Sequence, residues 1–450
     1  MSRIVDAVTA VLVHRGHVMV LKRQGFLRAF PGYSAFPGGK VDAEDASGLD
    51  LPTAWHAIES RLLRALIREL QEEIALDLVA LHTEGGVLTL RDLGIALTPA
   101  PAPVRFNTHF FLIELAERPD VKADAHEIAE FSWAPPGEWL EQYQNGRIIA
   151  APPTVAVLRA LGTNINADEI PGLHFETRKR YELPLIESVA GVRQILVRSN
   201  TIPPAQHTNC FLLGDLQSHR VLVDPSPADD AEMEKLVAVA NRFGIHEIFL
   251  THHHPDHRER ANLIARTLDV PMGMSEDTQT RIREKAGLAY FDEISVNIYR
   301  EGDVLCRWLG QAVEVYEVPG HDEGQLALMP ESRAWCIVSD LIQGLGTVVI
   351  AKPEGNMRKY LASLRKVIEL NPMAIYPSHG IGLGGTFRLR DTLHHREMRE
   401  KQILALIHEG RDMSGMLAAI YPDLDPRLLP LAQMNIESHL DKLREDGVVA

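Results

Sequence analysis

Short apolar runs alternate with amphipathic stretches along most of the chain, a pattern typical of strands and helices in layered α/β folds. In the N-terminal third, the apolar runs 6–13 and 18–23 flank the turn 14–17 and predict two adjacent strands. A helix is predicted over 52–76, and further strands over 85–89 and 105–114. The Pro-rich stretch 98–103 predicts a loop.

The central part of the chain repeats this alternation. Strands are predicted at 192–197, 208–214, 220–224 and 245–250, and helices at 228–243 and 258–268. Three later strands are predicted at 313–318, 334–339 and 374–378, and each is followed within three residues by a ligand-capable side chain. The C-terminal part predicts helices at 390–409, 413–421 and 428–445, followed by an apolar strand at 447–449.

Composition limits the number of domains, the kind of binding surface and the cellular location that we expect. A length of 450 residues predicts roughly two to four domains, and a hydrophobic content of 45% provides ample core material. The net charge of −15 argues against a general polyanion-binding surface. Three scattered cysteines fit neither a disulfide framework nor a CxxC metal site, so we expect a reducing, cytoplasmic location. We expect no signal sequence and no membrane helix, because the apolar runs are too short.

The most informative stretch is Thr251–His257, which directly follows the predicted strand 245–250. Its ligand-capable side chains crowd into one turn, with spacing that can serve two neighbouring metal ions: His252, His254, Asp256 and His257. Imidazole and carboxylate together suit Zn²⁺ and related transition metals. A solvated histidine-rich turn is the alternative, but the metal motif requires this combination of strand, loop and clustered ligands.

Three other predicted strands end at side chains that could complete such a site. The strand 313–318 leads to His321, the strand 334–339 to Asp340, and the strand 374–378 to His379. For any one of them alone, a capping or surface role is the better interpretation. Four strand ends that all carry ligand-capable side chains are improbable by chance.

These motifs, in this order, resemble the metallo-β-lactamase fold family over about residues 186–388. The resemblance implies an αββα sandwich in which His252, His254 and His321 hold one metal ion. Asp256, His257 and His379 would hold the second, and Asp340 would bridge the two. Asp224 matches the family's first motif, an acid that supports the ligand loop. The chain departs from the family after His257, where Arg258-Glu259-Arg260 replaces the usual small residues.

The ligands imply hydrolysis. A dinuclear site of two Zn²⁺ or other transition-metal ions would bind and ionise a water, and the resulting hydroxide would attack the substrate, with Asp256 as proton acceptor or relay. The bond that is cleaved stays open at this point, because ester, thioester, amide and phosphodiester substrates all fit.

An acidic helix face marks the N-terminal third. Glu69, Glu72 and Glu73 share one face of the predicted helix 52–76, and such oxygen ligands favour Mg²⁺ or Mn²⁺. A solvated acidic face is the alternative, and it is weakened by the upstream glycine turn Phe36–Lys40.

Together, this turn and Arg68-Glu69-Leu70-Gln71-Glu72-Glu73 resemble the Nudix hydrolase family. The resemblance implies metal-binding roles for the three glutamates, a catalytic role for Glu73, an orienting role for Arg68, an edge strand at 131–134 and a last helix near 152–161. The segment departs from the family in an insertion at about 46–60, in Ala75 at the usual glycine, and in an acid of the loop half that is Asp45 or Glu44. Such an insertion looks like the coenzyme A diphosphatase branch.

The C-terminal helices resemble the winged-helix tail of the β-lactamase-like-protein-2 family, whose members include single-strand endoribonucleases. We therefore predict a Nudix-like domain (1–163), a linker (164–185), a metallo-β-lactamase-like domain (186–388) and a winged-helix-like helical domain (389–450). The resulting fold class is multi-domain α/β, with an α/β/α Nudix layer arrangement, a central αββα sandwich and a small helical domain.

Three functional interpretations follow. The first is a small-molecule hydrolase that cleaves an ester or thioester centrally and a nucleoside-diphosphate-linked compound, such as a coenzyme A derivative, in the Nudix half. The second is an endoribonuclease for single-stranded RNA with a nucleotide-binding Nudix half, although the third C-terminal helix carries mixed charges. The third makes the Nudix half a non-catalytic sensing or dimerising module, against which the intact glutamate set counts. The sequence leaves a homodimer open.

Overall fold

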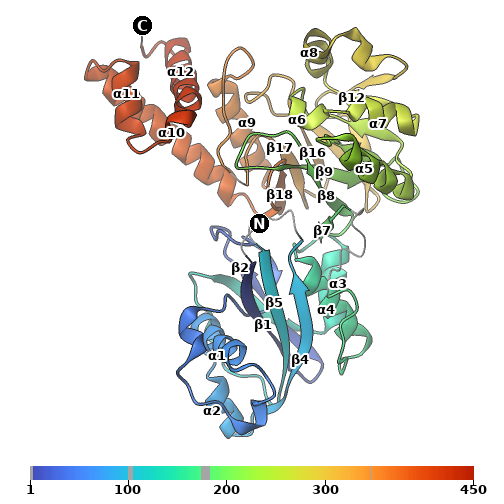
Figure 1. The fold of residues 1–450 in the computed structure, drawn as a ribbon, viewed down its shortest axis with the longest axis vertical. Helices are drawn as coiled ribbons and strands as arrows, with labels where there is room; N and C mark the ends of the chain where they lie inside the picture. Colours follow the sequence, from blue (N-terminus) through green and yellow to red (C-terminus); the bar gives the residue numbers. More distant parts are fainter. Residues whose placement is uncertain (1–3, 100–104, 174–182, 345, 450) are drawn as a thin grey trace. The chain divides into compact units, whose positions relative to one another are not determined.

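A computed structural model of the chain describes residues 4–99, 105–173, 183–344 and 346–449 (Figure 1). Its contacts form two compact units, Met1–Ala190 and Gly191–Ala450. The four domain limits predicted from the sequence stay predictions. Most of the predicted loop 98–103 and part of the predicted linker 164–185 lie outside the described residues.

The first unit is built on a six-stranded sheet of order β3-β2-β1-β5-β4, in which β6 also pairs with β2. The predicted hairpin of two apolar strands is confirmed, and β1 also runs parallel to β5. The strands are β1 (Ile4–His14), β2 (His17–Arg23), β3 (Ser34–Ala35), β4 (Val87–Leu97), β5 (Arg105–Leu115) and β6 (Ile128–Ala134). A further strand, β7 (Leu185–Val189), ends the unit.

Helices cover both faces of this sheet (Figure 1). Alternate side chains of β1 point to opposite faces, so Leu12 packs in the cluster of α1 while Val13 packs in the cluster of α4. This gives the predicted α/β/α layers. The helices are α1 (Ser60–Ile74), α2 (Leu78–Thr83), α3 (Pro136–Gln144) and α4 (Pro152–Thr163), with short 3₁₀ turns η1 (Ala43–Ala46) and η2 (Thr53–Trp55).

The predicted helix 52–76 is too long at its N-terminal end. The α-helix begins at Ser60, and residues 53–55 form only a short 3₁₀ turn. The cause is tertiary, because Trp55 is buried in the core, where its ring lies 4.5 Å from that of His82. The apolar residues of this stretch therefore face the core from a turn rather than from a helix.

The second unit contains two sheets. The first has the strand order β13-β12-β11-β10-β9-β8 and the second runs from β14 to β19 in sequence order. Contacts such as Phe211 against Tyr376 and Asn209 N to Ser378 O (2.7 Å) join the sheets face to face. The strands of the first sheet are β8 (Val192–Arg198), β9 (His207–Leu213), β10 (Val221–Val223), β11 (Glu247–Phe249), β12 (Met272–Met274) and β13 (Val296–Ile298).

Strand direction places the strand ends together. β10, β11, β12 and β13 pair in parallel, and so do β17 and β18, so their carboxyl ends lie at common sheet edges. Asp224 and Thr251 follow two of these strands, and Asp340 and His379 follow the other two. The strands of the second sheet are β14 (Val304–Trp308), β15 (Gln311–Glu317), β16 (Leu326–Pro330), β17 (Cys336–Ser339), β18 (Ala374–Pro377) and β19 (Leu383–Gly384).

Helices flank these sheets, which gives an αββα sandwich (Figure 1). The helix α9 packs its apolar face on the second sheet, whereas α5 and α7 lie against the first. The helices are α5 (Asp230–Phe243), α6 (Pro255–Arg258), α7 (Ala261–Leu268), α8 (Glu276–Ala286), α9 (Met357–Leu370), α10 (Phe387–His408), α11 (Met413–Ile420) and α12 (Leu429–Glu445), with 3₁₀ turns η3 (Leu288–Phe291) and η4 (Pro426–Leu428).

The predicted helix 258–268 is interrupted. It is divided into α6 and α7 because Arg260 adopts a left-handed backbone with φ of 59°. The Arg260 guanidinium donates a hydrogen bond to Ala228 O at 2.9 Å, which holds this break in place.

The three C-terminal helices are confirmed and share a small apolar core. The apolar strand predicted at 447–449 is wrong, since Val448 N and Val449 N both donate to Leu443 O. The end of the chain therefore caps α12, and Val449 packs against the helices.

Replacing Gly320 by alanine tests the packing that precedes His321. A Cβ atom there would lie 2.2 Å from Tyr360 N, at a backbone φ of 131°. We expect a loss of roughly 3 kcal/mol in unfolding free energy, measured by denaturant unfolding. Gly137→Ala is the control, because its Cβ would meet open space in a helix. Equal stability of the two variants would contradict the packing argument.

Candidate metal centre

The ligand-capable side chains of the second unit lie where loops leave the strands. His252 and His257 are fully buried in the turn after β11, and His379 and Asp340 are nearly so after β18 and β17. His254 is the most exposed of these histidines, with 22% of its side chain accessible. The sandwich therefore brings together every residue that the sequence places in this site.

One group of ring nitrogens converges around His254. Its Nδ1 atom lies 3.0 Å from His252 Nε2 and 3.0 Å from His321 Nε2. Three such nitrogens within a few ångströms can act as ligands of one metal ion.

A second group lies next to the first. Asp256, His257 and His379 form it, with His379 Nε2 3.6 Å from Asp256 Oδ2. Asp340 lies between the groups, because its Oδ2 atom is 3.6 Å from the Nε2 atoms of both His257 and His321. Its Oδ1 atom is 3.7 Å from His379 Nε2. This position suits a carboxylate that bridges two ions.

The outer nitrogen of each histidine ring contacts a separate polar group. Nδ1 of His321 lies 2.9 Å from Val349 O, and Nδ1 of His379 lies 2.9 Å from His207 O. Such contacts select the tautomer that leaves the inner nitrogen with a lone pair. The remaining contacts are His252 Nδ1 with Ser339 Oγ (3.3 Å), His254 Nε2 with Glu354 Oε2 (3.0 Å) and His257 Nδ1 with Asp224 Oδ2 (2.9 Å).

Asp224 joins this turn to the neighbouring strand. Its Oδ1 atom accepts from Thr251 N at 2.8 Å, and its Oδ2 atom accepts from the Thr251 hydroxyl at 2.6 Å and from His257 Nδ1. The buried carboxylate thus holds the start and the end of the histidine turn. Its role as a support for a metal centre stays a prediction.

The site residues fit metal ions. His257 Nε2, His379 Nε2 and Asp340 Oδ1 are buried and have no hydrogen-bond partner among the described residues. Burial, with the neighbouring His257, lowers the pKa of His252 well below its usual range, so its ring is neutral, as a metal ligand must be. Burial also lowers the pKa of His321, to about 4. The mixed imidazole and carboxylate donors suit Zn²⁺ or a related ion.

Several contacts near this centre have no counterpart in the sequence interpretation. Fully buried His253 lies with Nδ1 2.6 Å from Oδ2 of Asp322. Glu354 contacts His254, and Lys285 contacts both Glu354 and His253. No motif marks Glu354 or Lys285, although Asp322 directly follows a predicted ligand.

The departure Arg258-Glu259-Arg260 has a structural role. Arg258 Nε donates to His253 O at 2.6 Å, and the Tyr290 hydroxyl donates to Arg258 O. Glu259 accepts from Asn200 Nδ2 at 2.7 Å. These contacts hold the outer side of the histidine turn.

The N-terminal site is organised by Arg68. Its guanidinium donates to both carboxylate oxygens of Asp45, at 3.1 and 3.0 Å, and to Glu69 and Glu72 at 2.9 and 3.0 Å. Burial alone would raise the pKa of Asp45, but the hydrogen bonds from Arg68 and from Asp42 N, together with the positive charges of Arg68 and Arg61, lower that pKa on balance. Of the two acids considered for the loop half, Asp45 is therefore the one that meets the arginine.

Glu73 takes a different partner. Its Oε2 atom accepts from Gly38 N at 2.8 Å, and its Oε1 atom lies 3.8 Å from Arg23 Nη1. The glycine turn needs its glycines, because a Cβ on Gly38 would lie 2.1 Å from Val8 O. Glu69, Glu72 and Glu73 share one helix face, but the described residues do not gather their three carboxylates into one ligand group.

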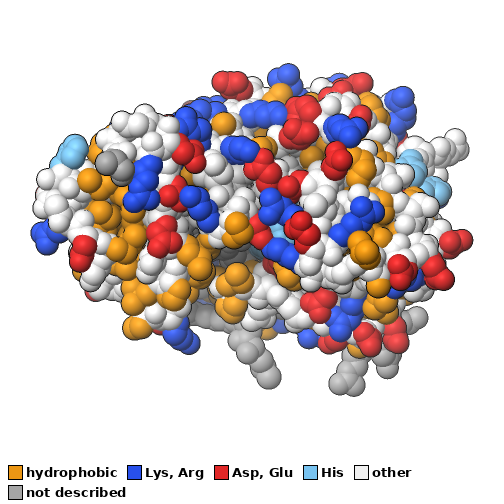
Figure 2. Space-filling view, turned by 90° about the horizontal axis from the view of Figure 1, so that it is seen from above, with side chains coloured by type: hydrophobic (Ala, Val, Ile, Leu, Met, Phe, Trp, Pro, Cys, Tyr) orange, Lys and Arg blue, Asp and Glu red, His pale blue; other side chains and the backbone are white. Residues whose placement is uncertain are grey.

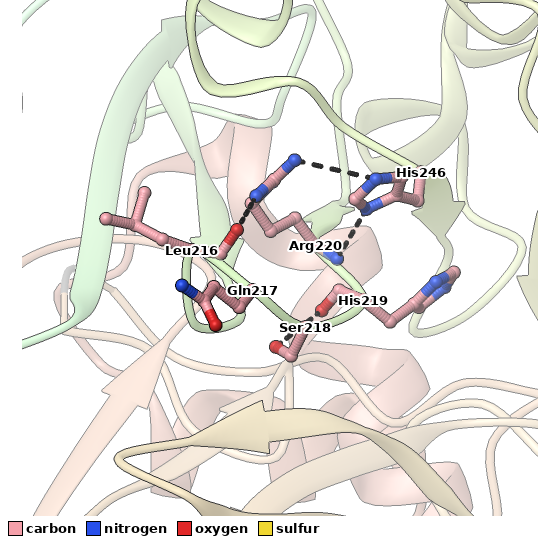
Figure 3. A pocket seen from close by; sticks show the side chains of 6 residues that line it. All are labelled: Leu216, Gln217, Ser218, His219, Arg220 and His246. Atoms are coloured by element: carbon pink, nitrogen blue, oxygen red, sulfur yellow. Dashed lines mark hydrogen bonds between the residues drawn. The ribbon is translucent and has the colours of Figure 1, made fainter.

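The second unit also has a surface hollow of about 410 Å³. Figure 3 shows Arg220 directed toward the backbone of Leu216 and toward His246 at this hollow. The hollow is lined by the turn Leu216–Arg220 together with His246, and none of these residues belongs to the ligand groups.

Comparison with known proteins locates three family matches. The metallo-beta-lactamase superfamily matches residues 203–379, the NUDT19 Nudix domain residues 64–161, and the beta-lactamase associated winged helix domain residues 415–450. Beta-lactamase-like protein 2 homolog of Drosophila melanogaster is 26% identical over 295 residues, which cover 59% of this chain and 93% of that protein.

Two further relatives concern the central domain. Atrochrysone carboxyl ACP thioesterase of Aspergillus fumigatus is 25% identical over 203 residues, 44% of this chain and 59% of its own. The structure of a beta-lactamase domain protein from Burkholderia ambifaria aligns with a TM-score of 0.51 and 22% identity, over 58% of this chain and 88% of that one, which supports the fold. No described helix is long and apolar enough to cross a membrane.

The buried carboxyl of Glu73 predicts a pH-dependent stability. Burial raises its pKa from 4.5 to about 8, so the folded chain binds its proton more tightly than the unfolded chain. The stabilisation is complete below the unfolded pKa and is lost as pH rises through 8. In metal-free protein, Glu73→Gln should therefore become more stable than wild type above that pH, by on the order of a few kcal/mol.

Thermal unfolding across this pH range, with chelator present, measures the effect. Glu72→Gln is the control, because 60% of the Glu72 side chain is exposed. A difference between Glu73→Gln and wild type that does not grow with pH would contradict the expectation.

Proposed function

Because the chain is a hydrolase that joins a metallo-β-lactamase superfamily domain to a Nudix domain and an associated winged-helix domain, we propose that its central site hydrolyses an ester or thioester. The observation that carries this is the cluster of five buried or half-buried histidines around Asp340. The relative named as a thioesterase supports the choice of bond.

The residues of the central site would have separate roles in metal binding and proton transfer. His252, His254 and His321 would hold one ion, and Asp256, His257 and His379 the other, with Asp340 between them. When bound, such ions lower the pKa of a water to about 7 and polarise the oxygen of the bond to be cleaved. Asp256 is partly exposed and would accept the proton that leaves during attack.

The Nudix site would act on a nucleoside-diphosphate-linked compound such as a coenzyme A derivative. Its carboxylates are the oxygen donors that Mg²⁺ or Mn²⁺ prefers. Arg68 orients Glu69 and Glu72, while Glu73 is held at the glycine turn in a buried position where it can exchange a proton. An acyl-coenzyme A compound would give both sites a common substrate.

The charge distribution supports a small molecule over RNA. Basic side chains of α12 are engaged within the protein, with Lys442 bound to Glu400 and Asp446 and Arg444 bound to Asp441. Figure 2 shows basic and acidic side chains interspersed on the face in view. A nucleic-acid surface would instead concentrate basic residues along one face.

A substrate panel tests the proposal. We expect wild type to hydrolyse an acyl-coenzyme A thioester and a nucleoside-diphosphate-linked compound, but not single-stranded RNA. His257→Ala should lower thioester hydrolysis at least a hundredfold and leave cleavage of the nucleoside-diphosphate-linked compound unchanged. Glu73→Gln should lower the latter activity and leave thioester hydrolysis unchanged. Cleavage of RNA that depends on His257, without thioester hydrolysis, would replace our proposal by the ribonuclease interpretation.

Metal content tests the centre itself. We expect about two transition-metal ions per chain, by elemental analysis, and a loss of one or both in His252→Ala and Asp340→Ala. His246→Ala is the matched control, because this histidine lies at the separate surface hollow. Unchanged metal content in the first two variants would contradict the assignment.

A further inference from the structure

A chain of charged and polar side chains lies directly behind the proposed metal centre. It runs from Asp322 through His253, Lys285 and Glu354 to His254, and its members come from four separate segments of the fold. His253 and Asp322 are fully buried, and 16% of the Glu354 side chain is exposed. None of these contacts is needed to fill the ligand set described above.

Lys285 determines the direction of the hydrogen bonds, because an ammonium group only donates. It donates to Glu354 Oε1 and, over 2.9 Å, to His253 Nε2. The proton of His253 must then be on Nδ1, which lies 2.6 Å from Asp322 Oδ2. This last contact brings the neutral ring close to the carboxylate but lies outside regular hydrogen-bond angles, since neither atom has a partner that meets them.

The other end of the chain acts on a ligand. A carboxylate only accepts, so Glu354 Oε2, 3.0 Å from His254 Nε2, requires the His254 proton on that nitrogen. The lone pair is then on Nδ1, the atom that converges with His252 Nε2 and His321 Nε2. His254 is the one ring in the site that presents Nδ1 inward, and it is also the most exposed.

We propose that Glu354 is a positioning residue that selects the Nδ1-ligating tautomer of His254, and that Lys285, supported by His253 and Asp322, holds Glu354 for this role. The proposal rests on the metal centre proposed above. An alternative interpretation of the same cluster is an additional metal site, formed by His253, His254, Asp322 and Glu354. The Lys285 ammonium already provides the positive charge there, and it would repel an added cation.

The segment that carries Glu354 is held on its N-terminal side. Val349 O accepts from His321 Nδ1, and Lys352 pairs with Asp441 of α12 at 2.7 Å. The buried Arg396 of α10 donates to Val348 O. The C-terminal helices therefore fasten the segment that orients two ligands of the same ion.

Metal binding by the full-length chain tests the proposal. We expect Glu354→Ala to weaken Zn²⁺ affinity by about 10- to 100-fold and to change the visible spectrum of the Co²⁺-substituted protein. Glu354→Gln should lose less, because its amide oxygen can still accept from His254, and this variant carries the test if the alanine variant does not fold. The control is Glu323→Ala, which removes a nearby acid that pairs with Lys359 at the surface.

The possible outcomes distinguish the proposed metal-dependent function from the positioning role of Glu354. Wild-type protein that binds no transition metal would overturn the proposed function itself. Wild-type protein that binds two ions, with Glu354→Ala and Glu354→Gln both unchanged in affinity and Co²⁺ spectrum, would overturn only the role of Glu354. A Lys285→Met variant that binds one more ion than wild type would favour the additional metal site. That result would also overturn the positioning role of Glu354.

Discussion

The central site depends on the hydrogen bonds at the outer nitrogens of its histidine rings. A buried neutral imidazole can present a lone pair at either nitrogen, and an outer acceptor decides which one carries the proton. Asp224 does this for His257 while it also holds Thr251, and main-chain carbonyls do it for His321 and His379. Without these partners, the inner nitrogens would not converge on common points.

The two sites differ in how the negative charge of their carboxylates is compensated. In the first unit, Arg68 lies among Asp45, Glu69 and Glu72 and compensates their negative charge within the protein. In the central site, His257, His321 and His379 lie around Asp340, and among the described residues the buried Nε2 atoms of His257 and His379 have no hydrogen-bond partner. That arrangement leaves the compensating charge to bound ions, whereas the Nudix carboxylates are already satisfied in part by their arginine.

The loops of the central domain owe their shape to contacts between distant segments. The residues Arg258–Arg260, which replace the small residues usual in the family, bind backbone and side chains of neighbouring loops. The helix α8 contributes in a similar way at both ends, since Ser275 donates to Gly324 O and Lys285 reaches His253. The loops around the ligand groups are thus held by elements that carry no ligand.

The sequence alone predicted which side chains the structure brings together in the central site, because they follow apolar strands and strand ends are readable from local pattern. It also identified the acidic face of α1, since residues three and four apart must share a helix face. It could not identify Glu354, which meets His254 across 100 residues from a loop without a motif. Nor could it place the start of α1, because Trp55 is drawn into the core by tertiary packing. Contacts between distant segments decided which nitrogen of each histidine faces inward, and no local pattern encodes such contacts.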